Sequence, residues 1–98
     1  MELTSIKDLF RNQEKYIDTK VTVGGWLRSK RSSKSFGFLV LNDGTFFEPL
    51  QVVYHDKLDN FAKINKLNVG AALIVTGTLV ATPEAKQPFE IQADVVEI

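Results

Sequence analysis

Residues 36–44 read Phe-Gly-Phe-Leu-Val-Leu-Asn-Asp-Gly, and this short stretch predicts a β-strand that ends in a tight turn. Side chains alternate between the two faces of a strand, so Leu39 and Leu41 share one face while Phe36 and Phe38 share the other. The Asn-Asp-Gly sequence that follows is a strong turn signal, because these residues tolerate the backbone conformations that tight turns need. The stretch therefore places the chain among β-rich folds.

The segment upstream of this strand has the pattern of a longer strand. From Lys20 onward, Val21, Val23 and Leu27 alternate with other residues, as in a half-buried strand. The Gly24-Gly25 pair in its middle predicts a bulge or a sharp bend. A long first strand that bends at glycine is what a small barrel needs at its corner.

A short helix is expected before that strand, over residues 4–12. Thr4 or Ser5 can cap its start, and Ile6, Leu9 and Phe10 form an apolar stripe at helical spacing. A helix of this length is unstable by itself, so we expect it to dock on the rest of the chain.

The pattern elsewhere predicts the remaining elements of the fold. These are a polar turn at 32–35, a strand at 50–54, a helix-like segment at 56–67, a strand at 71–80 interrupted by Gly77, a loop at 81–88 and a strand at 89–98. A helix, three strands, a helix and two strands follow one another in the order of the OB-fold. We therefore predict an all-β, five-stranded Greek-key barrel, with an open five-stranded sheet as the alternative. Residues 1–98 are expected to form one domain, with the N-terminal helix of residues 1–14 packed on the barrel.

The composition narrows the classes of function. The 98 residues include 12 basic and 12 acidic side chains, so global charge does not hold this chain to nucleic acid. The absence of cysteine excludes disulfides and cysteine-bound zinc, and favours a reducing cytoplasm. No apolar run is long enough to cross a bilayer, and the first residues do not have the pattern of a signal peptide.

An aromatic face next to a basic segment is the main candidate for binding. Leu39 and Leu41 suffice for the core, which leaves Phe36 and Phe38 at least half exposed, as base-stacking side chains are. The alternative is that both phenylalanines pack under the N-terminal helix. The nearby basic residues could hold phosphates or form a solvated hairpin tip; they are Arg28, Lys30, Arg31 and Lys34.

Two polar residues on other strands could read the edge of a base. Gln51 points away from the core face that Leu50 and Val52 supply, and its amide offers both a donor and an acceptor. Glu90 lies opposite Phe89 and could accept a hydrogen bond from a base. Each has the plain alternative of an ordinary surface residue.

The sequence gives no candidate for catalysis or for a metal site. His55 is the one histidine and has no ligand partners at metal spacing, so we expect a surface residue at a turn. The Gly24-Gly25 pair is not followed by the lysine and serine of a phosphate-binding loop, and no serine sits in a nucleophile elbow.

Taken together, three segments resemble the OB domain of class IIb aminoacyl-tRNA synthetases, which are the aspartyl, asparaginyl and lysyl enzymes. The segments are Val21-Thr-Val-Gly-Gly-Trp-Leu-Arg-Ser-Lys-Arg31, Phe36-Gly-Phe-Leu-Val-Leu-Asn-Asp-Gly44 and Leu50-Gln-Val-Val53. The resemblance runs from Ile6 to Ile98, and the Leu-Asn-Asp-Gly sequence is most similar to bacterial asparaginyl enzymes.

The resemblance implies a role for each candidate residue. In the family, an aromatic residue at the position of Phe38 stacks on the central anticodon base, a uracil. Residues at the positions of Gln51 and Glu90 read that base, and an arginine corresponds to Arg31. We expect Arg28 and Lys30 to help hold phosphates and Phe36 to support or extend the stacking platform. Lys86 and Gln87, in the loop at 81–88, are candidates for the outer anticodon bases.

The family's catalytic domain is missing from this sequence, so we expect either an excised domain or a free-standing paralogue, which binds RNA and does not itself activate an amino acid. The resemblance implies no cofactor in this domain, with ATP and magnesium bound elsewhere in the full-length enzyme. The implied partners are a tRNA anticodon stem-loop, of tRNA-Asn for an asparaginyl enzyme, and the C-terminal catalytic domain of a homodimeric parent. The rivals are a general binder of single strands, a barrel whose Phe36/Phe38 face binds a protein, and an aspartyl- or lysyl-enzyme domain.

Overall fold

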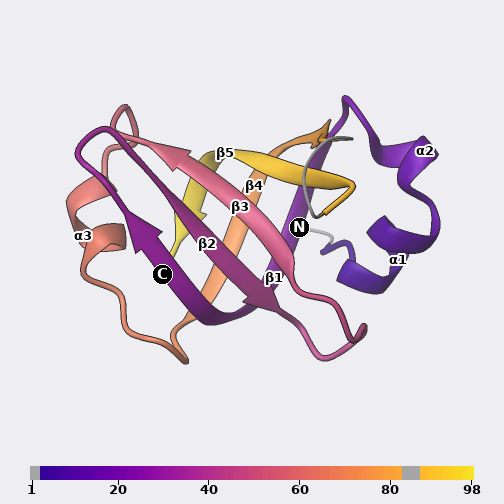
Figure 1. Cartoon of the computed structure of the whole chain (residues 1–98), viewed down its shortest axis with the longest axis horizontal. Coiled ribbons are helices and arrows are strands. Elements are labelled where there is room, and N and C mark those ends of the chain that lie inside the picture. Colours follow the sequence, from indigo (N-terminus) through magenta and orange to yellow (C-terminus); the bar gives the residue numbers. More distant parts are fainter. Residues whose placement is uncertain (1–2, 83–86) are drawn as a thin grey trace.

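The chain folds into a closed five-stranded barrel, as seen in a computed structural model that describes residues 3–82 and 87–98. The strands follow one another around the barrel in the order β1-β2-β3-β5-β4 (Figure 1). All neighbours are antiparallel except β3 and β5, which are parallel. The last strand therefore inserts between the third and fourth, and the predicted five-stranded OB barrel is confirmed while the open sheet is not.

The elements have the following bounds. The helices are α1 (Ile6–Arg11), α2 (Gln13–Tyr16) and α3 (Phe61–Asn65), and the strands are β1 (Lys20–Ser32), β2 (Phe36–Asn42), β3 (Leu50–His55), β4 (Ala72–Ala81) and β5 (Phe89–Glu97). The short helix α2 was not expected from the sequence, because it is only four residues long. The strands agree with the predicted ones to within a residue or two at their ends.

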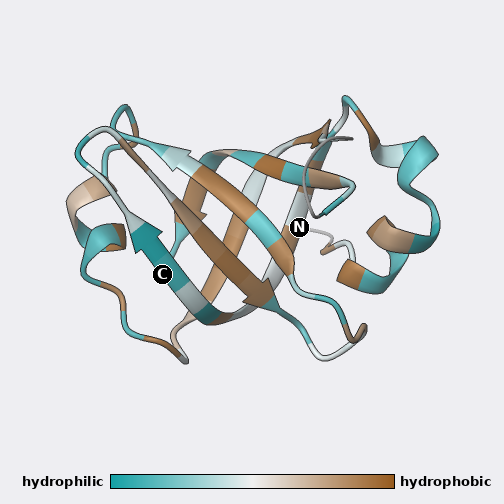
Figure 2. Ribbon diagram, viewed as in Figure 1, coloured by the Kyte–Doolittle hydropathy of each residue, from teal (hydrophilic) through white to brown (hydrophobic). Residues whose placement is uncertain are grey.

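The core lies inside the barrel and is built from alternate residues of each strand. In β2, Leu39 and Leu41 are fully buried, and in β3 Leu50 and Val52 are too. Apolar segments accordingly concentrate on the strands, whereas α2 and most loops are polar (Figure 2). The period of two that the sequence shows thus separates an inner from an outer face on every strand.

The first strand turns the corner of the barrel close to its glycine pair, but its bulge lies elsewhere. Trp26 pairs with Ala72 of β4 on one side and with Asn42 of β2 on the other, so the strand changes partner there. The pairing with β4 runs without interruption through Gly24 and Gly25. The register shift falls between Leu27 and Ser29, so the extra residue is Arg28; of the two alternatives predicted for the glycine pair, a bulge or a sharp bend, the bulge is wrong.

Gly25 is required for a different reason, which is a close approach of two strands. A Cβ atom at this position would lie 2.7 Å from the carbonyl oxygen of Asn42, closer than any side chain tolerates. Gly25 therefore allows β2 to approach β1 closely at the corner.

The connection between β3 and β4 contains less helix than predicted. Only Phe61–Asn65 is helical, whereas residues 56–60 form turns, with Leu58 donating to the carbonyl of His55 and Phe61 to that of Leu58. These are bonds to the third residue back, as in a 3₁₀ turn rather than an α-helix. The Asn60 side chain donates to the carbonyl of Val96 at 2.7 Å, which ties the turn to β5. The apolar side of this segment does face the core, with Ile64 fully buried.

The N-terminal helix docks on the barrel as expected. Ile6 and Leu9 are buried, and the Ser5 hydroxyl caps the helix by accepting a hydrogen bond from the amide of Asp8. Phe10 stacks on Phe46 with a ring separation of 4.9 Å. The hydroxyl of Tyr16, in the next helical turn, donates to the Asp8 carboxylate and lowers the pKa of that carboxyl group.

The Asn-Asp-Gly turn anchors this helix. One oxygen of the Asp43 carboxylate accepts from the amide of Ile6 at 2.9 Å, and the other accepts from the amide and hydroxyl of Thr45. The Thr45 hydroxyl in turn accepts from the amide of Lys7 at 3.0 Å. Two amides of the first helical turn, which have no partner within the helix, are thus satisfied by the turn after β2.

Replacing Asp43 by alanine should loosen this anchor. The Asp43→Ala variant loses the acceptor for two backbone amides, and we expect the free energy of unfolding to fall by about 1–3 kcal/mol. Urea denaturation of the purified chain measures the change. As a matched control, Asp56→Ala removes an exposed acid from the turn after β3 and should change stability by no more than about 0.5 kcal/mol. Equal effects of the two substitutions would show that Asp43 does not hold the helix.

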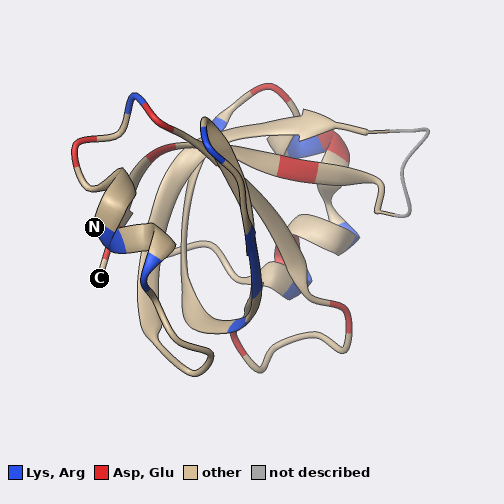
Figure 3. Ribbon diagram, turned by 60° about the vertical axis from the view of Figure 1, so that its left-hand side comes forward, with Lys and Arg blue, Asp and Glu red and all other residues tan. Residues whose placement is uncertain are grey.

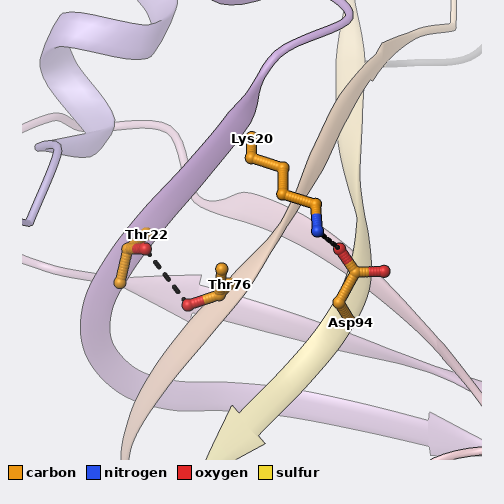
Figure 4. A network of polar contacts seen from close by, with 4 residues as sticks. All are labelled: Lys20, Thr22, Thr76 and Asp94. Carbon is orange, nitrogen blue, oxygen red and sulfur yellow. Dashed lines mark hydrogen bonds and ion pairs between the residues drawn. The ribbon is translucent and has the colours of Figure 1, made fainter.

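The outer side of the barrel where β1, β4 and β5 adjoin carries polar contacts between strands (Figure 4). Thr22 and Thr76 share a hydrogen bond of 3.1 Å, and Lys20 lies 3.3 Å from the Asp94 carboxylate. Both charged side chains are largely exposed, so this ion pair contributes little to stability. Asp94 is the unpaired residue of a second bulge, because Thr76 pairs with Val95 and Gly77 with Ala93.

The helices of the described residues are all short. None of those found in residues 3–82 and 87–98 has the length and apolar character required to cross a membrane.

Candidate nucleic-acid interface

The outer faces of β1, β2 and β3 form a shallow groove that holds several of the predicted residues. Its volume is about 470 Å³, and it is lined by Ser29, Lys30, Arg31, Phe38, Val40 and Gln51. The register explains the grouping, because Arg31 pairs with Phe38 across β1 and β2, and Val40 pairs with Gln51 across β2 and β3. Paired residues point to the same face, so an arginine, an aromatic ring and an amide share one surface.

A carboxylate joins this surface from the neighbouring strand. The Gln51 amide nitrogen donates to one oxygen of Glu90 at 3.1 Å, and the Gln92 amide nitrogen donates to the other at 2.6 Å. The parallel pairing of β3 with β5, which sets Val52 against Ile91, brings Gln51 and Glu90 side by side. The structure thus brings together the two residues expected to read one base.

Gln92 was not among the candidates. It lies two residues after Glu90 on the same strand, so both side chains leave the same face. That spacing was the signal available in the sequence. Its amide holds the second oxygen of the carboxylate and fixes the direction in which Glu90 points.

The aromatic residues of β2 lie on the outside of the barrel. Phe36 is 39% exposed and Phe38 is half-buried, with their ring centroids 5.6 Å apart and their planes almost perpendicular. The N-terminal helix instead packs its own aromatic ring, that of Phe10, against Phe46 and Phe89. The alternative in which both β2 phenylalanines lie under that helix is therefore wrong.

The three predicted basic residues of β1 differ in where their side chains lie. Charges of both signs are spread over the molecule, and β1 carries a run of basic residues (Figure 3). Arg31 is exposed on the groove side, opposite Phe38. Lys30 pairs with the buried Leu39, and its ammonium group donates to the backbone carbonyl of Asn65. Arg28 is exposed at the bulge and lies outside the groove lining.

Asn65 also accepts a second hydrogen bond, through its side chain, which ties α3 to β3. Tyr54 is fully buried, its hydroxyl donates to the Asn65 side chain at 2.7 Å, and burial raises the pKa of this phenol. A Cβ atom on Gly37, the cross-strand partner of Tyr54, would overlap the tyrosine ring. Glycine between Phe36 and Phe38 therefore lets the ring pack beneath them and leaves both phenylalanines on the outer face.

Among the remaining candidates that the structure describes, neither Gln87 nor His55 lines this groove. Lys86 falls outside the described residues, whereas Gln87 is described and its backbone carbonyl accepts from the Thr82 hydroxyl at 2.7 Å. His55 is exposed at the end of β3. Within residues 3–82 and 87–98, no three acidic or histidine side chains cluster as metal ligands.

A closed barrel of this strand order, with aromatic, amide and basic side chains on the outer face of β2 and β3, defines the class of OB-fold nucleic-acid-binding domains. Comparison with known families agrees. The chain belongs to the tRNA anti-codon family of OB-fold nucleic acid binding domains, whose model matches residues 21–98.

The chain is also similar to longer curated proteins. It is 51% identical over 98 residues to the asparagine–tRNA ligase of Clostridium tetani, covering all of this chain and 21% of that protein. It is 52% identical over 98 residues to the asparagine–tRNA ligase of Bacillus cytotoxicus, with the same coverage of 100% and 21%. The chain thus spans about a fifth of the length of these relatives.

Solved structures of asparaginyl-tRNA synthetases contain the same fold. The enzyme of Pyrococcus horikoshii, complexed with asparaginyl-adenylate, superposes with a TM-score of 0.85 at 22% identity, covering 100% of this chain and 22% of that one. The enzyme of Entamoeba histolytica, also complexed with asparaginyl-adenylate, gives a TM-score of 0.67 at 27% identity, covering 82% and 20%.

Proposed function

We propose that this chain is the anticodon-binding module of an asparagine–tRNA ligase and recognises an anticodon loop with uracil at its centre. The similarity to asparagine–tRNA ligases supports the identity of the parent enzyme. The groove on the outer face of the barrel supports the proposed mode of RNA binding. The observation that carries the proposal is the Gln51–Glu90 hydrogen bond beside Phe38, which places an amide and a carboxylate at the edge of an aromatic platform.

The chemistry of this arrangement matches uracil. A base stacked on Phe38 presents its Watson–Crick edge to side chains at the rim of the ring. Uracil carries an N–H donor between two carbonyl oxygens, so Glu90 can accept a hydrogen bond from that N–H while the Gln51 amide donates to a carbonyl. Cytosine presents an unprotonated nitrogen at the same place, and a carboxylate facing that nitrogen is repelled.

The basic residues contribute to the affinity for RNA and do not select the base. Arg31, with Arg28 and with Lys30 once its ammonium group leaves the Asn65 carbonyl, contacts phosphates of the loop. Three such contacts on a single strand imply that raising salt from 50 to 200 mM lowers affinity by roughly 15- to 20-fold.

In the parent enzyme this module would position tRNA-Asn for esterification with asparagine. The catalytic domain, which would bind ATP and magnesium, would then lie in the part of the relatives that this chain does not span. We further propose that the parent is a cytoplasmic homodimer, in which the catalytic domain is the second partner of this module. The tRNA would contact the groove around Phe38 on the outer faces of β1, β2 and β3.

A titration with anticodon stem-loops tests the proposal. The chain should bind a loop with central uracil at least about 5-fold more tightly than the same loop with central cytosine, because one mismatched hydrogen-bonded edge costs about 1–3 kcal/mol. Fluorescence anisotropy at 50 and 200 mM salt measures both the preference and its salt dependence. Equal affinity for both loops would instead indicate a general binder of single strands. Absence of binding at low salt would favour a barrel that contacts protein.

A further inference from the structure

The end of the β2–β3 ladder carries an aromatic pair that the central-base site does not use. Phe36 pairs with His55 across the two strands, and their ring centroids lie 6.4 Å apart at an interplanar angle of 36°. Both side chains are exposed, and Phe36 keeps 39% of its surface open although it is a large apolar residue. The pair therefore presents apolar surface to solvent at one end of the groove.

The backbone under this pair is held firmly. The carbonyl of Phe36 accepts hydrogen bonds from the amide of Ser33 at 2.9 Å and from its hydroxyl at 2.8 Å. The amide of Asp56 donates to the carbonyl of Ser35 at 2.9 Å, which joins the two strands just beyond the aromatic pair. The ring of Phe36 thus stands on a fixed hairpin, and little ordering is required before a ligand can use it.

This surface is continuous with the Phe38 groove. A second recess of about 150 Å³ is lined by Arg31, Ser32, Ser33, Phe36, Gly37 and Phe38. Arg31 and Phe38 also line the first groove, so one arginine lies between the two recesses. An RNA strand whose base occupies Phe38 and which continues past Arg31 into the second recess meets Phe36 there.

We propose that Phe36 and His55 form a second stacking site, which holds the nucleotide next to the central base. The proposal rests on the function proposed above, because it requires the central base at Phe38. The planes of Phe36 and Phe38 lie at 89°, so bases stacked on the two rings cannot stack on each other. The strand is splayed at this step, as single-stranded RNA loops are when proteins read them.

The second site adds affinity without selecting a base. Every base has a face that stacks on an aromatic ring, and neither recess lining places a side-chain amide or carboxylate against Phe36 within the described residues. The imidazole of His55 extends the stacking surface beyond the phenyl ring. The occupant is thus a flanking nucleotide of any sequence.

Stem-loops with abasic sites test this inference. Each loop position that flanks the central uracil is replaced in turn by an abasic nucleotide, and binding is followed by fluorescence anisotropy. For wild type, one of these replacements should weaken binding by about 5- to 150-fold. Phe36→Ala should weaken binding of the intact loop by a similar factor and make that same abasic replacement almost without effect. His55→Ala should show a smaller loss at the same position.

A matched control and the contrary results make the test decisive. Phe47→Ala removes a phenylalanine that is 79% exposed on the β2–β3 loop, and it should leave affinity unchanged. If Phe36→Ala binds like wild type while central uracil is still preferred, the second site is wrong and the proposed function stands. If Phe36→Ala weakens intact and abasic loops equally, Phe36 only supports Phe38 and the inference fails. If wild type ignores the central base or binds no RNA, the proposed function fails and the second site with it.

Discussion

The Phe38→Ala variant should lose most of its affinity for an anticodon stem-loop, by about 5- to 150-fold, because stacking on one aromatic ring contributes about 1–3 kcal/mol. The isolated domain has zero net charge, so its starting affinity rests on few contacts and this loss brings binding close to the limit of detection. Fluorescence anisotropy at low salt measures the change. The ring is half-buried on the outer face, so the free energy of unfolding should fall by less than the about 3–5 kcal/mol typical of a core phenylalanine.

Two further variants separate stacking from base reading. Phe38→Tyr keeps an aromatic ring of the same outline, so it should retain affinity within a few-fold and serves as the matched control. Glu90→Gln replaces a pure acceptor by an amide, so it should reduce the preference for central uracil over cytosine. If Phe38→Ala unfolds the barrel instead, the ring belongs to the core and the outer face has been assigned to the wrong residues of β2.

The barrel was predictable because its signals are local. Alternation along β2 predicts that Leu39 and Leu41 lie on one face of the strand and Phe36 and Phe38 on the other. The structure places the leucines inside the barrel and the phenylalanines outside. The Asn-Asp-Gly turn was equally clear as a turn. Its second function, in which Asp43 holds the amide of Ile6, joins residues 37 positions apart and is invisible to local pattern.

The errors arose where two distant segments decide the geometry. Leu58, Phe61 and Ile64 have the spacing of a helix, but the bond from Asn60 to the carbonyl of Val96 holds the first part of this segment in turns. A bulge or a sharp bend of β1 was expected at the glycine pair. A bulge arises where one strand has an extra residue relative to the strand it pairs with, so its position depends on the partner strand as well. In this chain the pairing of β1 with β2 places the extra residue at Arg28.

The candidate site, too, was predictable from the sequence only in part. Alternation along the strands was enough to pick out Phe36 and Phe38, and also Gln51 and Glu90, while the family resemblance supplied the joint role of the last two. The structure adds the parallel β3–β5 register that lets the two side chains meet, and it adds Gln92. It also turns the ammonium group of Lys30 toward Asn65, which depends on the position of α3 and could not be read from the charge of the segment.

Gly77 joins the stability of the barrel to the geometry of this site. It stands opposite the bulge of β5, where the register shifts and Asp94 is left unpaired. A Cβ atom at this position would lie 2.9 Å from the Cα of Ala93 and would overlap the backbone carbonyl oxygen of Gln92. Backbone atoms of a paired strand cannot move aside as a flexible side chain can, so any larger residue must displace β5 at Gln92 and Ala93.

The Gly77→Ala variant should therefore be destabilised by about 2–3 kcal/mol or more, as overpacked cores are. For a domain of this size that corresponds to a melting temperature lower by roughly 10–20 °C, which calorimetry or circular dichroism measures. The control is Gly24→Ala, whose Cβ would be crowded only by the exposed side chain of Leu3, at 3.0 Å, and would lie at an ordinary contact distance of 3.9 Å from Ile74. This variant should change stability by less than about 1 kcal/mol. Because Gln92 positions Glu90, the folded fraction of Gly77→Ala should also show a weaker preference for central uracil, whereas Gly24→Ala should not. Equal melting temperatures for the two variants would mean that β5 can shift without cost, and that its bulge does not hold Glu90 in place.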